Sequence, residues 1–242
     1  MSIDITVTIV TYKTDLAVLD AAVKCIHSNS FNIYVVIADN DSGSSYFSVL
    51  QGKYRNSDIN VVSTGKNGGY GYGHNYAEIQ CPESTYHLVM NADVKFDSQC
   101  IDDMYHYMQA HDDLVLISPK VLNPDSSLQY LNKRTPTVLD LLLRRITPSF
   151  LQDVVFIKKR LDYYEMRDVD YDQEYDLELV SGCFMFLSRE AFRKVKGFDE
   201  SYFMYFEDFD LSKRLSAFGR MAYVPKCEIV HYWGRGSKHS FS

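Results

Sequence analysis

YHLVMNAD, residues 86–93, carries the first evidence for the architecture of this chain. The apolar run from Tyr86 to Met90 predicts a buried strand, and two polar residues, Asn91 and Asp93, follow at its carboxyl end. In an open α/β sheet, ligands bind beyond the carboxyl ends of the strands. We therefore expect Asn91 and Asp93 to lie at a ligand site.

Strands and helices alternate ahead of this stretch and behind it. The alternation is typical of an α/β fold in which a single, doubly wound and mainly parallel sheet is flanked by helices. The second half is less regular, with no clear strand periodicity over 123–178, and predicts a smaller mixed portion. The expected strands are 5–10, 34–38, 59–62, 86–90, 114–118, 179–187 and 228–230, and the expected helices are 16–26, 73–80, 98–110, 188–196 and 207–218.

The composition excludes several classes of protein. A net charge of -7 over 242 residues argues against a nucleic acid partner, whose backbone requires a basic surface. The five cysteines form no Cys-x-x-Cys pair, which excludes a zinc knuckle and fits a reducing compartment. Because no signal peptide or transmembrane run is visible, we expect a cytoplasmic protein.

A glycine-rich segment, residues 66–75, follows the third expected strand. Four glycines between Gly68 and Gly73 free the backbone to approach a ligand and to point N–H groups at anionic oxygens. The segment matches neither the dinucleotide fingerprint nor the P-loop pattern. The other interpretation is a flexible turn before a helix.

Asp93 and His231 are candidate metal ligands. A carboxylate is a hard ligand for Mg²⁺ or Mn²⁺, and one or two carboxylates are enough when phosphates supply the other oxygens. Asn91 adds a neutral oxygen, and the imidazole of His231, at the end of an apolar run, completes such a site. In the structural alternative, Asp93 caps the turn after its strand and His231 is an ordinary strand-end residue.

Glu207 and Asp208 are candidate acid–base residues. The largely aromatic segment Tyr202–Phe206 precedes them and predicts a partly dry pocket, in which Asp208 can accept a proton from an attacking hydroxyl. The alternative is again structural, because carboxylates in the first turn of a helix interact favourably with its positive end.

Seven short segments form one pattern that spans nearly the whole chain. They are Val10 to Tyr12, Asp39 to Ser42, Asn67 to Asn75, Asn91 to Val94, Gly197 to Glu200, Tyr205 to Leu211 and His231 to Gly234. Together they resemble the family 2 inverting glycosyltransferases of the GT-A fold. The resemblance is closest to the rhamnosyltransferase-like branch, in which Asn-x-Asp often stands where other members have Asp-x-Asp.

The resemblance implies a role for each matching residue. On the nucleotide-sugar side, Thr11 and Tyr12 hold the base and ribose, Asp39 hydrogen-bonds the pyrimidine ring, and Lys66, Asn67 and Gly68 shape the pocket. At the reaction centre, Asp93 and His231 bind Mn²⁺ or Mg²⁺ with Asn91 alongside, Asp208 is the general base and Glu207 orients the acceptor. The asparagine at position 91 removes one carboxylate, which should weaken the metal site.

The resemblance also implies the reaction and the division of the chain. A sugar moves with inversion from a nucleoside-diphosphate sugar to a hydroxyl of a glycan or lipid-linked acceptor, in surface polysaccharide biosynthesis. dTDP-rhamnose is the first candidate donor, and a UDP-sugar is the second. Residues 1–242 form a single domain, with a nucleotide-sugar-binding half over 1–122 and an acceptor-binding half over 123–242.

Three other functions compete with this one. A sugar-phosphate nucleotidyltransferase would share the sheet and the metal carboxylate, but it carries its glycine-rich loop after the first strand, where residues 11–15 contain no glycine. A hydrolase with Asp93 and Asp208 as a carboxylate pair would leave Asp39 unexplained. The third alternative is a catalytically inactive carbohydrate-binding or scaffolding member.

Residues 137–161 form an amphipathic stretch with interleaved basic clusters. Such segments can lie on an anionic membrane surface, which predicts peripheral contact with the cytoplasmic face of a membrane. The alternatives are a helix pair that packs on the sheet and a homodimer contact.

Overall fold

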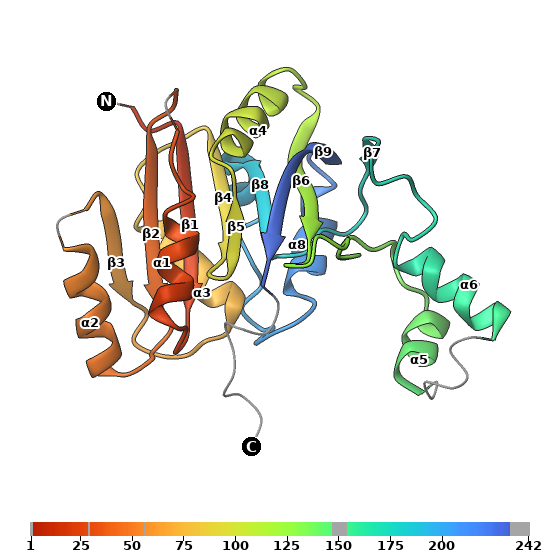
Figure 1. Cartoon of the computed structure of the whole chain (residues 1–242), viewed down its shortest axis with the longest axis horizontal. Helices are drawn as coiled ribbons and strands as arrows, with labels where there is room; N and C mark the ends of the chain where they lie inside the picture. Colours follow the sequence, from red (N-terminus) through yellow and green to blue (C-terminus); the bar gives the residue numbers. More distant parts are fainter. Residues whose placement is uncertain (1, 29, 56, 147–153, 233–242) are drawn as a thin grey trace.

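The computed structural model describes residues 2–28, 30–55, 57–146 and 154–232. Over these residues the fold is built on one nine-stranded mixed sheet with helices on both faces (Figure 1). The strand order is β3-β2-β1-β4-β8-β6-β9-β5, and β7 pairs with β9 beside this path. The strands are β1 (Ile5–Thr11), β2 (Ile33–Asp39), β3 (Ile59–Ser63), β4 (Tyr86–Asn91), β5 (Val94–Phe96), β6 (Leu114–Leu122), β7 (Tyr175–Asp176), β8 (Phe184–Ser188) and β9 (Arg220–His231).

The first four strands are parallel, and the later ones make the sheet mixed. β8 runs antiparallel to both β4 and β6, β6 and β9 are parallel, and β5 is antiparallel to β9. The predicted α/β class is therefore confirmed, with the parallel pairing concentrated in the N-terminal half. Both halves of the chain contribute strands to one sheet, and their assignment to donor and acceptor stays a prediction.

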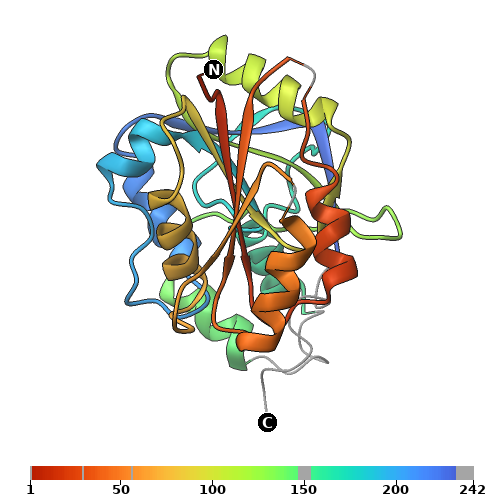
Figure 2. The ribbon, with the colours of Figure 1, turned by 90° about the vertical axis from the view of Figure 1, so that its left-hand side faces the viewer.

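The helices are α1 (Leu16–Val23), α2 (Ser44–Tyr54), α3 (Tyr70–Ile79), α4 (Gln99–Gln109), α5 (Val138–Ile146), α6 (Val155–Tyr164), α7 (Arg189–Lys194) and α8 (Glu207–Leu215). Figure 2 shows α1 and α2 on one side of the sheet and α3 on the other. The alternation of side chains along β1 explains this arrangement. Ile5, Val7 and Ile9 join the core beneath α1 and α2, whereas Thr8 on the opposite face bonds to His74 of α3.

One predicted strand differs strongly from the structure. β9 begins at Arg220, whereas the sequence pattern predicted a strand only from 228. The prediction began too late because Pro225 interrupts the pattern in the middle of the strand. The register against β6 passes from Val224, opposite Pro119, to Glu228, opposite Lys120, so the intervening residues form a bulge. A proline is tolerated in a strand at such a position.

Helices α5 and α6 stand apart from the sheet. They pack against each other and project from one side of the molecule, toward the end at which β1 to β4 finish (Figure 1). The alternative interpretation of residues 137–161, a helix pair that packs on the sheet, is therefore not observed for α5 and α6. None of the helices in the described part of the chain is long and apolar enough to span a bilayer.

Candidate active site

The carboxyl ends of the central parallel strands bring the first predicted residues together. Asp39, the last residue of β2, is in register with Thr11, the last residue of β1. On the other side of β1, Val10 is in register with Asn91, the last residue of β4. Because these strands are neighbours, three of the predicted site residues lie along one edge of the sheet.

Thr11 and Asp39 are both buried at this edge. The Tyr46 hydroxyl donates to the Thr14 carbonyl at 2.8 Å, so the Thr11 hydroxyl is the donor in its 3.0 Å bond to Tyr46. The Asp39 carboxylate accepts from the Ser42 N–H at 3.2 Å, and burial raises the pKa of Asp39. Both side chains are held in place before any ligand binds.

Asn40 is a residue that sequence reasoning did not single out. Its Nδ2 donates to Asn67 Oδ1 at 3.0 Å and to the Gly69 carbonyl at 2.9 Å, while its own N–H donates to the Thr11 carbonyl. It therefore fixes the start of the glycine-rich segment against the end of β1. Its place in the segment Asp39 to Ser42 was the available signal.

Three further predicted residues form the rim of this edge. Tyr12 is partly exposed, and the ammonium of Lys13 lies 5.0 Å from its ring centre. Lys66 is exposed, with its ammonium 4.6 Å from the ring centre of Tyr72. The N–H of Gly68 donates to the Lys66 carbonyl at 3.1 Å. The nucleotide-binding roles of these residues stay predictions.

The glycines of residues 66–75 allow close packing, whereas the sequence suggested that all four form a ligand-binding loop. α3 begins at Tyr70, so Gly71 and Gly73 are helical and do not belong to a phosphate-binding loop. A Cβ on Gly73 would lie 2.7 Å from Val10, and one on Gly69 would lie 2.1 Å from the Phe203 carbonyl oxygen. Gly69 also has a φ of 92°, which favours glycine. The loop interpretation thus applies to Gly68 and Gly69, and the later glycines allow close approach.

The predicted metal ligands come together where β4 and β9 end. His231 Nε2 lies 3.3 Å from Asp93 Oδ1 and 3.2 Å from Asn91 Nδ2. The N–H of Tyr232 donates to the Asp93 carbonyl, and His231 is in register with Val94 of β5. Residues 140 positions apart in sequence therefore meet in a compact group, in which Asp93 and His231 are buried and Asn91 is half-buried.

Gln129 orients the histidine of this group. Its Nε2 donates to the His231 carbonyl at 2.7 Å, so its Oε1, 3.0 Å from His231 Nδ1, is an acceptor. Nδ1 then carries a proton, and Nε2 is the ring nitrogen that faces Asn91 and Asp93. This is the arrangement that metal-binding histidines use. Gln129 lies in the stretch without periodicity, which gave no signal for it.

The donor set fits a hard divalent ion with two protein ligands. No group of three His, Cys, Asp or Glu side chains with metal-binding geometry occurs within the described residues. A carboxylate and an imidazole suffice when phosphate oxygens and water complete the shell, as Mg²⁺ and Mn²⁺ sites often require.

The candidate base lies at the start of α8. Asp208 Oδ2 accepts from the Gly182 N–H and Oδ1 accepts from the Phe209 N–H, each at 2.9 Å. Burial raises the pKa of Asp208, and these two bonds oppose that rise. Tyr205 and Phe206, with φ near 70°, turn the chain into α8 through two consecutive left-handed residues. Such backbone strain occurs most often at functional sites.

Glu207 is the more strongly perturbed of the two acids. It is buried, and Oε2 has no hydrogen-bond partner among the described residues. Burial, followed by the charge of Asp208, raises the pKa of Glu207 to about 7. A carboxyl with this pKa can exchange a proton near neutral pH.

The aromatic segment Tyr202–Phe206, which precedes these acids, does not shield them from solvent. The five side chains of Tyr202–Phe206 are 37% to 66% exposed. Asp208 is half-buried and packs instead against Gly182, whose backbone also contacts the ring of Tyr70. The prediction that this aromatic segment forms a partly dry pocket around Asp208 is therefore wrong.

The metal group and the base face one another across the segment before β8. The negative charges of both Asp93 and Asp208 raise the pKa of Tyr70 and of Cys183, after the larger effect of burial. The Cys183 carbonyl accepts from the Asn91 N–H at 2.9 Å. The candidate metal ligands, the buried Glu207 and the half-buried Asp208 thus lie around the segment before β8.

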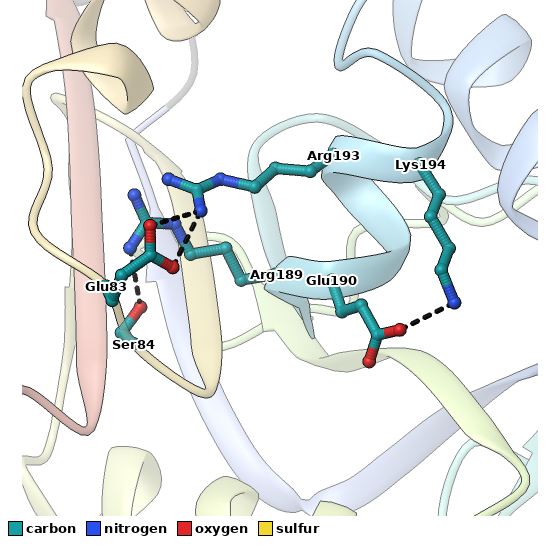
Figure 3. Close-up of a pocket in the computed structure, with 6 residues that line it drawn as sticks. All are labelled: Glu83, Ser84, Arg189, Glu190, Arg193 and Lys194. Atoms are coloured by element: carbon teal, nitrogen blue, oxygen red, sulfur yellow. Dashed lines mark hydrogen bonds and ion pairs between the residues drawn. The ribbon is translucent and has the colours of Figure 1, made fainter.

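A separate pocket of about 390 Å³ lies where β4 and α7 begin, away from this edge (Figure 3). Its charged side chains are paired with one another, Arg193 with Glu83 and Lys194 with Glu190. Arg189 is buried and bonds to Glu78 at 2.8 Å. These pairs neutralise the pocket and tie α7 to the loop before β4.

Comparisons with known proteins identify the family of this chain. The family model described as glycosyl transferase family 2 matches residues 6–196, and a model described as N-terminal domain of galactosyltransferase matches residues 163–234. An N-acetylglucosaminyl-diphospho-decaprenol L-rhamnosyltransferase of Mycobacterium tuberculosis is 28% identical over 215 residues. That match covers 83% of this chain and 66% of the relative, so the chain spans slightly less than two thirds of that protein.

Two solved structures share the fold. GalNAc-T7 with UDP, GalNAc and Mn²⁺ has a TM-score of 0.68 at 13% identity, covering 96% of this chain and 44% of its own. Residues 1–349 of Staphylococcus aureus TarS in complex with UDP-GlcNAc has a TM-score of 0.62 at 15% identity, covering 99% and 62%. Because the family 2 model matches residues 6–196, which is well over half of the chain, the chain belongs to glycosyl transferase family 2.

Proposed function

We propose that this protein transfers a sugar, with inversion and with the help of a divalent metal ion, from a nucleoside-diphosphate sugar to an acceptor hydroxyl. The observation that carries the proposal is the arrangement of Asp93 and His231 opposite Asp208, beyond the carboxyl ends of β1, β2 and β4. Thr11 and Asp39 are already held at this edge, where they can meet a nucleotide.

In the proposed single displacement, each of these residues has a separate role. Asp93 and His231 would hold Mn²⁺ or Mg²⁺, which when bound would neutralise charge on the departing diphosphate. Asp208 accepts the proton of the attacking hydroxyl, and the N–H groups of Gly182 and Phe209 hold its carboxylate in one orientation. Glu207, whose Oε2 bonds to none of the described residues, binds and orients that hydroxyl.

The donor and acceptor are inferred from similarity. The M. tuberculosis relative is an L-rhamnosyltransferase whose name specifies an acceptor carried on decaprenol diphosphate. We assign dTDP-rhamnose as the first donor to test and a lipid-linked saccharide as the first acceptor class. UDP-sugars are the second donor class, as in the TarS complex with UDP-GlcNAc.

The test is turnover by Asp208→Asn with Asp210→Asn as the matched control. Asp210 lies on the same helix but pairs with Arg214 at 2.6 Å, away from the proposed reaction. We expect Asp208→Asn to lose about 10²–10⁴-fold in kcat while nucleotide affinity is unchanged. Asp210→Asn should keep most of its kcat. Full activity of Asp208→Asn would exclude it as the base and transfer that role to Glu207, whose pKa of about 7 suits it.

The α5–α6 pair is the proposed membrane contact. Val138, Val155 and Phe156 are 64% to 76% exposed, and Lys158 and Lys159 beside them are exposed as well. Apolar side chains flanked by lysines suit an anionic lipid surface. The pair projects toward the end of the sheet that holds the candidate site (Figure 1), so a bilayer there would present a lipid-linked acceptor to Asp208.

Flotation with vesicles that contain anionic lipid tests this contact. We expect binding that falls when Val155 and Phe156 are both changed to Ser and when Lys158 and Lys159 are both changed to Glu. Ile79→Ser is the control, because Ile79 is 74% exposed on α3. Absence of vesicle binding, with a dimer found by sedimentation, would instead assign these helices to contact between two copies.

A further inference from the structure

Tyr70, the first residue of α3, connects the glycine-rich segment to the candidate base. Its hydroxyl donates to the Gly182 carbonyl at 2.5 Å. The N–H of the same glycine donates to Asp208 Oδ2 at 2.9 Å. Gly182 is therefore held by the tyrosine on one side and bonds to the carboxylate on the other.

The contact around Gly182 is tight enough to transmit a change of orientation. A Cβ at this position would lie 3.1 Å from Tyr70 Cε1 and 3.4 Å from Asp208 Cβ. A glycine lets the two side chains close on its backbone from both sides. Rotation of the Gly182 backbone would turn its N–H away from Asp208.

The ring of Tyr70 is itself fixed. It lies edge-on to His74, with 4.4 Å between ring centres, and edge-on to Phe198. His74 is fully buried and bonds to Thr8 of β1 at 2.8 Å. The N–H of Tyr70 donates to the Phe203 carbonyl at 3.1 Å. The hydroxyl is thus presented from a rigid support.

The segment around Gly182 has other anchors, so it does not depend on Tyr70 to fold. The Val180 N–H donates to Ser212 Oγ at 3.0 Å, and the Cys183 carbonyl accepts from the Asn91 N–H at 2.9 Å. Loss of the Tyr70 hydroxyl should leave these bonds in place and release only the orientation of Gly182 between them.

We propose that Tyr70 is a positioning residue for the base: its hydroxyl fixes the Gly182 backbone so that the Gly182 N–H stays directed at Asp208. The inference rests on the proposed function, because it assigns to Tyr70 the orientation of the group that accepts the proton. It also links the two sides of the site, since Asn40 holds Gly69, the residue before Tyr70.

The charged and titratable groups around Asp208 set the direction of the expected change. They are Glu207 on α8, Tyr70 on α3, Cys183 before β8 and Asp93 after β4. Burial raises the pKa of Asp208, and the Gly182 N–H lowers it. Misdirecting that N–H removes stabilisation of the carboxylate, so the pKa of Asp208 should rise further.

The experiment compares Tyr70→Phe with Tyr223→Phe. Tyr223 also donates a buried hydroxyl bond to a carbonyl, that of Tyr171 at 2.9 Å, so it controls for the loss of such a bond. The first readout is the titration of the Asp208 carboxyl carbon by ¹³C NMR, which requires no donor. The second is the pH profile of kcat with the KM for the donor.

We expect Tyr70→Phe to raise the pKa of Asp208 by about 0.5–1 and to move the acid limb of kcat upward by the same amount. At neutral pH, kcat should fall about tenfold, and the KM for the donor should stay within about twofold. Tyr223→Phe should leave both midpoints unchanged. Gly182→Ala, whose Cβ would separate Tyr70 from Asp208, should shift them in the same direction as Tyr70→Phe.

Unchanged titration of Asp208 in both Tyr70→Phe and Gly182→Ala would overturn the inference, even if kcat or thermal stability fell. The failure of the proposed function has a different signature. If Asp208→Asn turned over at the wild-type rate, Asp208 would not be the base, while the NMR titration would still decide whether Tyr70 orients its carboxylate.

Discussion

Replacing Glu207 with Gln should make the stability of this protein less dependent on pH. Burial raises the pKa of Glu207 from 4.5 to about 7, so the folded protein retains a proton that the unfolded chain has already lost. Below about pH 4.5 the carboxyl is protonated in both the folded and the unfolded state, so its ionisation does not lower the free energy of unfolding. Above pH 7 the folded state holds a buried charge, and its free energy of unfolding is lower by that cost.

The magnitude follows from the two pKa values. They differ by about 2.5, and at about 1.4 kcal/mol for each pH unit the cost approaches about 3.5 kcal/mol well above pH 7. Near pH 5 it falls below about 1 kcal/mol. A glutamine does not ionise, so the difference in unfolding free energy between Glu207→Gln and wild type should grow by about 2.5 kcal/mol between pH 5 and pH 8. In this chain that corresponds to roughly 5–10 °C in Tm.

Thermal unfolding followed by circular dichroism at pH 5, 6.5 and 8 measures this difference. Glu83→Gln is the control, because Glu83 is exposed and its pKa is lowered by Arg193 rather than raised. It should show no gain at pH 8. A difference between Glu207→Gln and wild type that is constant across the pH range would refute the assignment of a raised pKa to Glu207.

Two further substitutions test the packing and the metal group. Gly69→Ala places a Cβ 2.1 Å from the Phe203 carbonyl oxygen at a φ of 92°, and it should lower the free energy of unfolding in urea by about 2–4 kcal/mol. Gly52→Ala, within α2 and with open space around it, should instead be stabilising by about 0.5–1 kcal/mol; equal effects would contradict the packing account. Asn91→Asp adds a carboxylate beside Asp93 and His231, and it should tighten Mn²⁺ binding roughly tenfold in an EPR titration. Unchanged or weaker binding would place the ion elsewhere.

The parallel part of the fold was predictable because its strands are buried on both faces. The runs that became β2 and β4 are largely apolar, β1 alternates threonine with isoleucine and valine, and the polar residues at their ends mark the sheet edge. α2 was missed because only Leu50 and Tyr54 are buried along it, which leaves little helical periodicity. The early start of β9 was hidden by Pro225 at the bulge.

Asp93, His231 and Asp208 could be singled out from the sequence because one residue type can carry the chemistry proposed for each, and the structure brings Asp93 and His231 together while their roles stay predictions. The supporting residues were not, because their roles depend on contacts between distant segments. Gln129 orients His231 from 102 positions away, and Tyr70 reaches Gly182 across 112 positions. The exposure of Tyr202–Phe206 was equally hidden, since an aromatic run predicts burial more often than it predicts exposure.

Calorimetric titration of dTDP, UDP and GDP, each with and without Mn²⁺, tests the central claim most directly. Wild type and Asp93→Ala should be compared, because Asp93 belongs to the proposed metal group. We expect one pyrimidine diphosphate to bind wild type in a Mn²⁺-dependent manner and Asp93→Ala to lose that binding. No binding of any nucleotide to wild type, with or without Mn²⁺, would contradict a donor site at the ends of β1, β2 and β4.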